Sequence, residues 1–354
     1  MKKKIAVFLA LVLLVSFMAV GFSGCGNRGE YINVYNWGEY IDEELIDKFE
    51  EETGITVNYI TSATCEEMYA KVKNGGVAFD LVVPSDYMVS RMIEEGMLEP
   101  LDYSNIPNAK YVDENFLNPV YDPTGEYSMP YQWGTVGVIY NKDMVDESDI
   151  GSWDILWNEK YENQILMFDN SRDAMGIALK SLGHSYNIED PDVLRKAADL
   201  LIEQKPLVQA YVMDQIFDKM ESGEAAVAPY YTGDYYLMID EISEGEAPLG
   251  YFVPEEGSNM YVDAMCVPQG AQNKAGAEAF INFMLEPENM AQNTEWVCYS
   301  TAESAARDLL PENMKTNTDM YPTVEKLAEF ETYLNLKKDI RKLYDTLWIE
   351  IMSS

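Results

Sequence analysis

From residue 31 onward, hydrophobic and polar positions follow strand and helix patterns in turn. Apolar runs and strict alternation predict strands at 32–35, 55–59 and 81–83, and a 3.6-residue apolar spacing predicts helices at 43–53, 66–73 and 87–95. Asp42 is placed as the N-cap of the first helix, and Gly54 as the residue that ends it. This order is typical of a parallel α/β sheet, in which ligands bind beyond the carboxyl ends of strands. Because Trp37 and Ser85 each closely follow a predicted strand, we expect both to border one crevice.

A second α/β region is predicted from about residue 137 to 254. It contains strands at 165–168 and 225–230 and helices at 172–182 and 191–204, and it is followed by a strand at 261–268 and a helix at 274–285. The tail, 330–352, is predicted to be largely helical, with five apolar residues on one face: Leu336, Ile340, Leu343, Leu347 and Ile351. The chain therefore reads as an α/β protein.

The N-terminus has the pattern of an export signal. Three lysines at 2–4 precede the apolar run 5–20, and Phe22-Ser23-Gly24-Cys25 resembles a bacterial lipobox, although Phe22 stands where an aliphatic residue is usual. We therefore expect a lipoprotein signal peptide at 1–24, lipidation of Cys25 and a tether at 25–30. The protein would then be anchored outside the cytoplasmic membrane, at the cell surface or in a periplasm. The alternative is an ordinary signal peptide with an incidental cysteine.

The charge balance narrows the classes of partner. The chain has 354 residues, enough for about two domains, and carries 25 Lys+Arg against 61 Asp+Glu, a formal net charge of -36. Nucleic acid and anionic membrane surfaces would be repelled by such a protein. Its acidity favours cationic partners, although solubility alone can also account for it.

Cysteine and histidine usage argues against metal and disulfide chemistry. Lipidation of Cys25 would leave Cys65, Cys266 and Cys298, an odd number that does not suit a disulfide scaffold, and Cys266 is predicted to be a small core residue. The sequence assigns no role to Cys65 or Cys298. With His184 as the single histidine, neither a zinc site nor a Ser-His-Asp triad is supported, so we expect no metal and no cofactor.

Aromatic residues and carboxylates recur together at predicted strand ends. The segments concerned are 37–40, 85–87, 169–173, 231–234 and 261–263. An alkyl polyamine needs this combination, because carboxylates pair with its ammonium groups while aromatic faces pack on its methylenes and attract cations. An alkylammonium remains charged at neutral pH, as lysine does. The sequence therefore predicts a binding site for a polyamine.

The chain resembles the spermidine/putrescine-binding proteins of bacterial polyamine ABC importers. The matching stretches are YNWGEY at 35–40, MYAKV at 68–72, DLVVPSDY at 80–87, YSMPYQWG at 127–134 and NFML at 282–285. The resemblance implies a two-lobed type II periplasmic binding protein fold, with mixed sheets flanked by helices and the ligand in the interlobe cleft. It divides the chain into a first lobe, 31–134 plus 257–299, and a second lobe, 135–256 plus 300–354.

The same resemblance implies eleven ligand contacts: Trp37, Glu39, Tyr40, Ser85, Tyr87, Asn170, Asp173, Tyr231, Asp234, Tyr261 and Asp263. Trp37 and Tyr40 are expected on the ligand's methylenes, Glu39 and Asp173 near terminal amines, and Asp263 on another amine. Asn170 matches an Asp that the family has near the Asp173 position, and Ser85 and Tyr87 match first-lobe contacts.

Three of these positions bear on ligand length. Tyr231 and Tyr261 stand where the spermidine-specific member has tryptophan, and Asp234 matches an acidic contact of the putrescine-specific branch. The resemblance therefore does not decide which polyamine is preferred.

We expect a monomeric, non-enzymatic receptor that delivers spermidine or putrescine to an ABC permease after its lobes close on the ligand. One alternative is a ferric-ion receptor of the same fold, suggested by the adjacent Tyr230 and Tyr231. A second is a glycosidase that uses two of the carboxylates.

Overall fold

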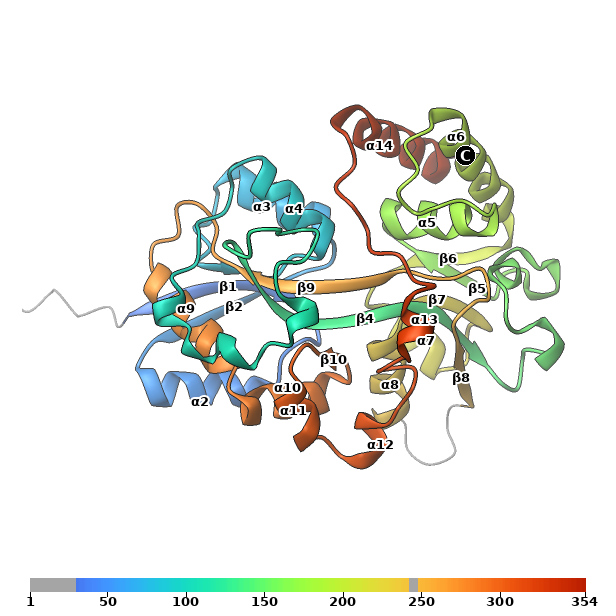
Figure 1. Cartoon of the computed structure of the whole chain (residues 1–354). Helices are drawn as coiled ribbons and strands as arrows, with labels where there is room; N and C mark the ends of the chain where they lie inside the picture. The colour runs from blue at the N-terminus through green and yellow to red at the C-terminus, as the bar shows by residue number, and fades with distance from the viewer. Residues whose placement is uncertain (1–29, 242–247) are drawn as a thin grey trace, which may run out of the picture.

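The computed structural model describes residues 30–241 and 248–354 (Figure 1). The predicted signal peptide, Cys25 and the tether as far as residue 29 lie outside the described residues. In the part that is described, no helix has the length and apolar character needed to cross a membrane.

A mixed sheet runs through the whole molecule. Its strand order is β2-β1-β3-β9-β4-β7-β5-β6, and β8 and β10 also pair with β4. The strands are β1 Tyr31–Trp37, β2 Thr56–Ser62, β3 Leu81–Val82, β4 Ser128–Asn141, β5 Ile165–Phe168, β6 Val208–Val212, β7 Val227–Tyr231, β8 Leu249–Phe252, β9 Met260–Cys266 and β10 Ser300–Thr301. Strands β1, β2 and β3 are parallel, as are β5, β6 and β7. The two groups are joined by β9 and β4, because β9 pairs antiparallel with β3 and β4, and β4 pairs antiparallel with β7.

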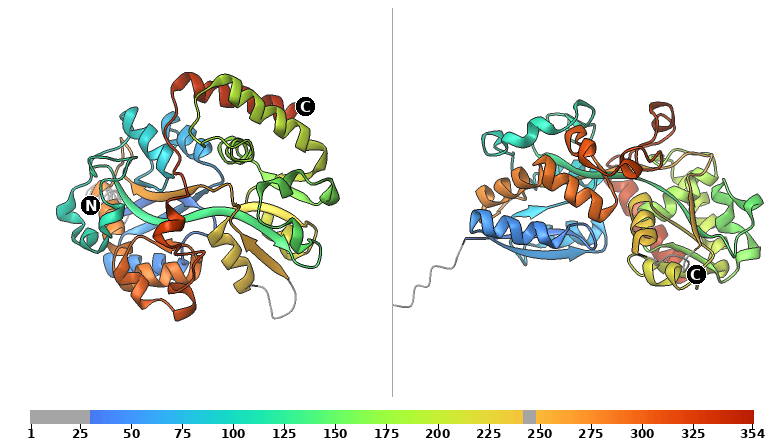
Figure 2. Two further views of the ribbon diagram at one scale, coloured as in Figure 1. Left: turned by 45° about the vertical axis from the view of Figure 1, so that its right-hand side comes forward. Right: turned by 90° about the horizontal axis from the view of Figure 1, so that it is seen from below.

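The helices form two groups, which pack on the sheet near the two ends of the long strands β4 and β9. They are α2 Glu43–Thr53, α3 Cys65–Asn74, α4 Asp86–Glu94, α5 Ser171–Ser181, α6 Pro191–Gln204, α7 Ile216–Glu221, α8 Thr232–Glu241, α9 Lys274–Met284, α10 Pro287–Val297, α11 Ser304–Leu309, α12 Glu312–Lys315, α13 Val324–Leu327 and α14 Lys338–Ser353. Figures 1 and 2 show two halves side by side: β1–β3 with α2–α4, α9 and α10 in one, and β5–β8 with α5–α8 and α14 in the other. Below, these are the β1 half and the β5 half.

Local signals place the elements much as the sequence predicts. The Asp42 side chain accepts a hydrogen bond from the Glu44 amide at the start of α2, and Gly54 ends this helix at a φ of 74°, where a side chain would be strained. Cys266 lies fully buried in β9. These findings confirm the predicted cap, helix end and core cysteine.

The predicted helix over 330–352 is wrong in its first part. Helix α14 begins only at Lys338, and the preceding chain runs extended between the two halves (Figure 1). The Glu331 amide donates to the Ser258 carbonyl, and the Met260 amide donates to the Glu331 carbonyl, both at 3.0 Å. Backbone pairing with the start of β9 therefore replaces the first helical turns, although Leu336 remains buried as its apolar pattern suggests.

Candidate functional site

A cavity of about 840 Å³, including its open mouth, lies where the two halves meet. From the β1 half it is lined by the ends of β1 and β2 and the starts of α3 and α4, and from the β5 half by the starts of α5 and α8 and the segment after β6. Parallel strands direct their carboxyl ends to this edge, which is the usual place for a ligand in such sheets. Trp37 and Ser85 both line the cavity, so the prediction that they share one crevice is confirmed.

All eleven residues predicted as ligand contacts line this cavity. They are Trp37, Glu39, Tyr40, Ser85, Tyr87, Asn170, Asp173, Tyr231, Asp234, Tyr261 and Asp263. The fold thus brings together five segments that lie far apart in sequence. Their contact with a ligand remains a prediction, which is developed below as a proposal.

Asp263 lines the cavity from strand β9. Its side chain is 5% exposed, and its carboxylate accepts hydrogen bonds from the Tyr40 hydroxyl at 2.7 Å and the Ser85 hydroxyl at 2.5 Å. Burial raises the pKa of Asp263 to about 6, while these two hydroxyl donors oppose the rise. The acid therefore has partners within the protein, but none of these partners carries a positive charge.

Asp173 lines the cavity from the first turn of α5. The Asn170 side chain caps this helix by accepting a hydrogen bond from the Asp173 amide. The hydroxyls of Tyr333 and Tyr231 each donate to the Asp173 carboxylate at 2.9 Å. Burial raises the pKa of Asp173, and hydrogen bonds together with the neighbouring Arg172 counteract this effect.

Asp234 lines the cavity from the first turn of α8. Burial raises its pKa to about 8; a hydrogen bond from Tyr299 lowers it, and the nearby charges of Asp214 and Glu39 raise it further. Gly233 gives the Tyr299 ring room to approach, since a Cβ at this position would lie 2.1 Å from the ring. Three carboxylates of the lining, those of Asp234, Asp214 and Glu39, therefore lie close together.

A row of tyrosine rings runs from Tyr231, which donates to Asp173, to Tyr40, which donates to Asp263. The rings of Tyr231 and Tyr261 lie 5.2 Å apart, those of Tyr261 and Tyr299 6.4 Å, and those of Tyr299 and Tyr40 4.7 Å, all in edge-to-face arrangements. Such rings offer apolar faces with negative electrostatic potential, which suit alkyl chains and cations. A row of this kind favours an elongated ligand with apolar segments between positive charges.

Sequence reasoning missed several lining residues, among them Glu66, Asp214, Tyr299 and Tyr333. Asp214 carried a usable signal, because it follows the end of β6 as the predicted acids follow other strands. Tyr333 was hidden by the mistaken helix over 330–352. Glu66 and Tyr299 lie in segments where no pattern distinguishes them from structural residues.

The charge of the cavity lining has one sign. Glu39, Glu66, Asp173, Asp214, Asp234 and Asp263 contribute carboxylates. No Lys, Arg or His occurs among the described residues that line the cavity. Arg172, the residue before Asp173, is not one of the lining residues. Its guanidinium lies 4.5 Å from the centre of the Tyr333 ring. A cationic ligand would remove the unfavourable electrostatics that these acids create.

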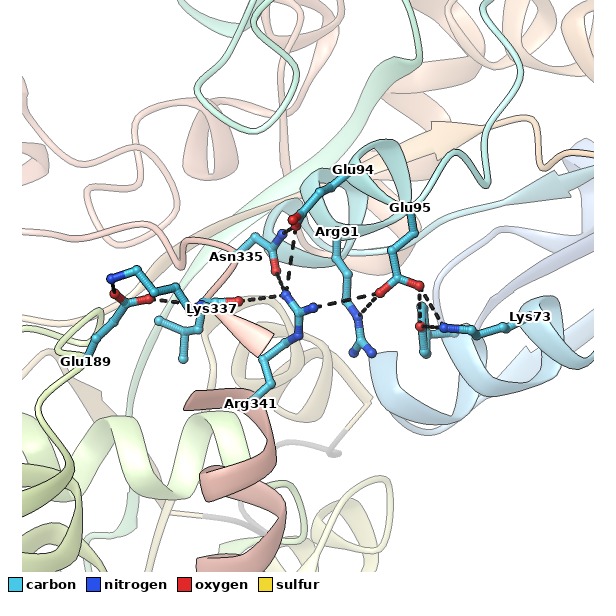
Figure 3. Close-up of polar contacts among 10 residues, drawn as sticks. Lys73, Arg91, Glu94, Glu95, Glu189, Asn335, Lys337 and Arg341 are labelled. Carbon is cyan, nitrogen blue, oxygen red and sulfur yellow. Dashed lines mark hydrogen bonds and ion pairs between the residues drawn. The ribbon is translucent and has the colours of Figure 1, made fainter. Parts of the chain in front are cut away.

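A polar network joins the two halves outside the cavity (Figure 3). The Asn335 amide donates to the Glu94 carboxylate at 2.5 Å, and the Arg341 guanidinium lies 3.8 Å from the Glu95 carboxylate. Burial alone would raise the pKa of Glu95, but hydrogen bonds from Lys73, Tyr69 and Arg91 lower it to about 2. Glu95 is therefore ionised at neutral pH and attracts Arg341 across the gap between the halves.

Comparisons with known proteins agree with this geometry. Residues 44–322 match the family of bacterial extracellular solute-binding proteins. The chain is 34% identical over 322 residues to a spermidine/putrescine-binding periplasmic protein of Salmonella typhimurium, covering 90% of this chain and 91% of that protein. It is 30% identical to the putrescine-binding periplasmic protein SpuD of Pseudomonas aeruginosa, covering 91% and 92%.

The fold is shared with solved structures. A putative spermidine/putrescine ABC transporter protein from Listeria monocytogenes superimposes with a TM-score of 0.86 at 42% identity, covering 91% of this chain and 99% of that chain. A spermidine/putrescine substrate-binding protein from Streptococcus pneumoniae gives a TM-score of 0.76 at 40% identity, covering 92% and 99%. The predicted type II periplasmic binding protein fold is thereby confirmed. The chain belongs to the bacterial extracellular solute-binding protein family and is similar to the substrate-binding components of ABC transporters.

Proposed function

We propose that this protein is a polyamine receptor that supplies an ABC importer with spermidine or putrescine. The observation that carries the proposal is the cavity lining, which combines six carboxylates and a row of tyrosines with no cation among its described residues. A polyamine offers the complementary pattern of ammonium groups separated by methylenes. The names of the relatives, which include spermidine/putrescine-binding and putrescine-binding proteins, support the same ligand class.

In this proposal each acid has a position along the ligand. Asp173 takes a terminal ammonium, Asp263 a central or second ammonium, and Asp234 with Glu39 the opposite end. Trp37, Tyr40, Tyr231 and Tyr261 pack on the methylenes between them. Ser85, Tyr87 and Asn170 complete the contacts, largely by orienting the acids.

Binding would proceed by closure of two lobes, 31–134 plus 257–299 and 135–256 plus 300–354. The chain passes between these lobes within the continuous strand β4, in the segment that leads into β9 and just before β10, and such a motion would turn about these connections. Strand β10 pairs with Gln132 and Trp133 of β4, and helix α11 packs against α10, so the chain just after residue 299 contacts the first of these lobes. A closed cavity excludes water and strengthens each carboxylate–ammonium pair.

The N-terminal pattern adds a location and an anchor to this proposal. Lipidated Cys25 would hold a monomeric receptor at the outer side of the cytoplasmic membrane, next to its permease. Cys25→Ala should release the protein from the membrane fraction or block its processing. Unchanged, lipid-labelled membrane association of this variant would refute the anchor while leaving the ligand proposal standing.

The two alternatives receive less support. Iron binding would use tyrosinates, but burial raises the pKa of both Tyr230 and Tyr231 well above the ordinary value, and Tyr231 already donates to Asp173. A glycosidase acts on a neutral sugar with two carboxylates, so a lining with six acids and no cation among its described residues exceeds what that chemistry needs. A receptor function without enzymatic activity accounts for the lining more simply.

A thermal-shift panel tests the proposed function. Spermidine and putrescine should raise the melting temperature, whereas ferric citrate and neutral oligosaccharides should not, because only a ligand that binds the folded state stabilises it. A rise with ferric citrate alone, accompanied by a coloured protein, would favour the iron receptor. Release of reducing sugar from oligosaccharides would favour the glycosidase.

A further inference from the structure

Glu66 is a cavity acid to which neither the sequence pattern nor the resemblance assigns a role. It lies in the first turn of α3, on the β1 half, where the N-terminal end of the helix favours a negative charge. The Tyr87 hydroxyl donates to its Oε1 at 3.0 Å. A carboxylate in this position is fixed in direction, since both its own helix and its tyrosine partner are packed in place.

The partner of Glu66 across the cavity is Asp173, on the β5 half. The Tyr87 ring meets the Tyr333 ring edge-to-face at 5.9 Å, and the Tyr333 hydroxyl donates to Asp173 at 2.9 Å. These contacts form a continuous series across the gap between the halves, from Glu66 through Tyr87 and Tyr333 to Asp173. One acid lies at each end of the series. Glu66 and Tyr87 belong to the β1 half and Asp173 to the β5 half, while Tyr333 lies in the extended segment between the halves.

When no cation is present, the negative charge of one acid opposes ionisation of the other. Burial raises the pKa of Glu66, and the charge of Asp173 raises it further. Arg172 lies 5.9 Å from the Tyr87 ring and moderates this repulsion, but it is held by Tyr344, Asn187 and the Leu334 carbonyl rather than by either acid. An ammonium group placed between two carboxylates would convert the repulsion into two attractions.

We propose that Glu66 and Asp173 together form the receptor for a terminal primary ammonium group and that Glu66 determines selectivity for it. This inference rests on the proposed polyamine function and deepens it. A primary ammonium has three N–H donors, so it can bond to acids on both sides of the cavity at once. An acetylated terminus is a neutral amide with a single N–H, and it would leave the two acids without a cation between them.

The arrangement also links ligand chemistry to closure. Because one acid belongs to each half, bringing the halves together without ligand places like charges near each other. With a terminal ammonium present, the same movement places one cation between two anions. A polyamine whose terminus is masked would therefore bind weakly even if its remaining amines reached Asp263 and Asp234.

The test compares Glu66→Gln with Glu67→Gln as a matched control. Glu67 is the next residue of α3, is exposed, and pairs with Lys71 on the same helix. Displacement titrations against spermidine, N1-acetylspermidine and N8-acetylspermidine would be made on the wild type and both variants. Melting of the ligand-free variants shows that each is folded.

We expect Glu66→Gln to weaken spermidine binding at least tenfold and Glu67→Gln to leave it within twofold. For the acetylated ligand whose amide occupies this end, Glu66→Gln should cost much less, because the interaction it removes is already absent. An equal loss for spermidine and both acetylated ligands would overturn the proposal, since Glu66 would then act only by holding Tyr87. An unchanged spermidine affinity would overturn it as well. Failure of the wild type to bind spermidine would instead refute the proposed function.

Discussion

Asp263→Asn is the substitution with the largest expected effect on ligand binding. It keeps the shape of the side chain and removes its negative charge. Asp263 is 5% exposed, and its hydrogen-bond partners, Tyr40 and Ser85, are neutral. In the proposed complex an ammonium group supplies the missing positive charge. The variant retains an oxygen that can accept one hydroxyl, but its amide nitrogen can only donate, so one of the two hydroxyls must turn to accept from it.

The magnitude follows from burial. Removing one member of a buried charge pair costs about 3–5 kcal/mol. At about 1.4 kcal/mol per tenfold, spermidine affinity should fall by about two to three and a half orders of magnitude. In the ligand-free protein, by contrast, the substitution should stabilise the fold. The pKa of Asp263 is about 6 against an ordinary 3.8, so ionising it in the folded protein at pH 7 costs about 3 kcal/mol, and Asn avoids this cost.

The assay combines calorimetric titration with melting of the ligand-free protein. Asp122→Asn serves as the control, because Asp122 is as deeply buried but lies away from the cavity and accepts hydrogen bonds from the backbone amides of Tyr127 and Ser128. We expect Asp263→Asn to lose affinity while keeping or gaining thermal stability, and Asp122→Asn to lose stability while keeping affinity. Near-normal affinity together with a lower melting temperature in Asp263→Asn would show that Asp263 is a structural acid.

Asp234→Ser should shift preference toward spermidine, because it removes the carboxylate that could hold the second end of a short diamine. Competition titrations of spermidine with putrescine measure this preference, and equal losses of affinity for both ligands would contradict the prediction. Burial holds the pKa of Asp263 at about 6 and that of Asp234 at about 8, both above the ordinary 3.8, so the folded protein binds more protons than the unfolded chain between about pH 4 and 8. Ligand-free stability should therefore fall as pH rises through this window, and the rise in melting temperature produced by spermidine should be larger at pH 8 than at pH 5; the reverse order would count against ionised acids as the ligand contacts. Arg341→Gln should raise the spermidine dissociation rate by no more than about fivefold, since a partly exposed ion pair contributes about 1 kcal/mol or less. Stopped-flow fluorescence would show it, with Lys337→Gln, whose pair with Glu189 stays within the β5 half, as the control; equal changes in both variants would exclude a role for the contact across the gap.

Much of the fold could be predicted from the sequence because the signals are local. The helix after Asp42 is set by a capping side chain and by Gly54, and the buried strands are recognisable as short apolar runs. The tail was mispredicted because Leu336 fits the apolar spacing of α14 although it lies outside that helix. The pairing of Glu331 with Ser258 and Met260 that prevents the helix joins residues about seventy positions apart, and no local pattern encodes it.

The residues of the candidate site also fall into those that could be predicted from the sequence and those that could not. Acids that directly follow strands, such as Asp173 after β5 and Asp234 after β7, are found by position, because strand ends converge at one edge of a parallel sheet. Tyr299 and Tyr333 reach the cavity from segments that do not belong to this edge. Their presence depends on how the chain crosses between the halves, which is a property of the assembled fold.

Calorimetric titration of the purified protein with spermidine and with putrescine tests the central claim most directly. The account predicts saturable one-to-one binding to at least one of the two polyamines at neutral pH, with protons released as the ligand displaces them from the buried acids. Proton release can be measured by repeating the titration in buffers with different ionisation enthalpies. Absence of binding to both polyamines, by a preparation that unfolds cooperatively on heating, would contradict the account.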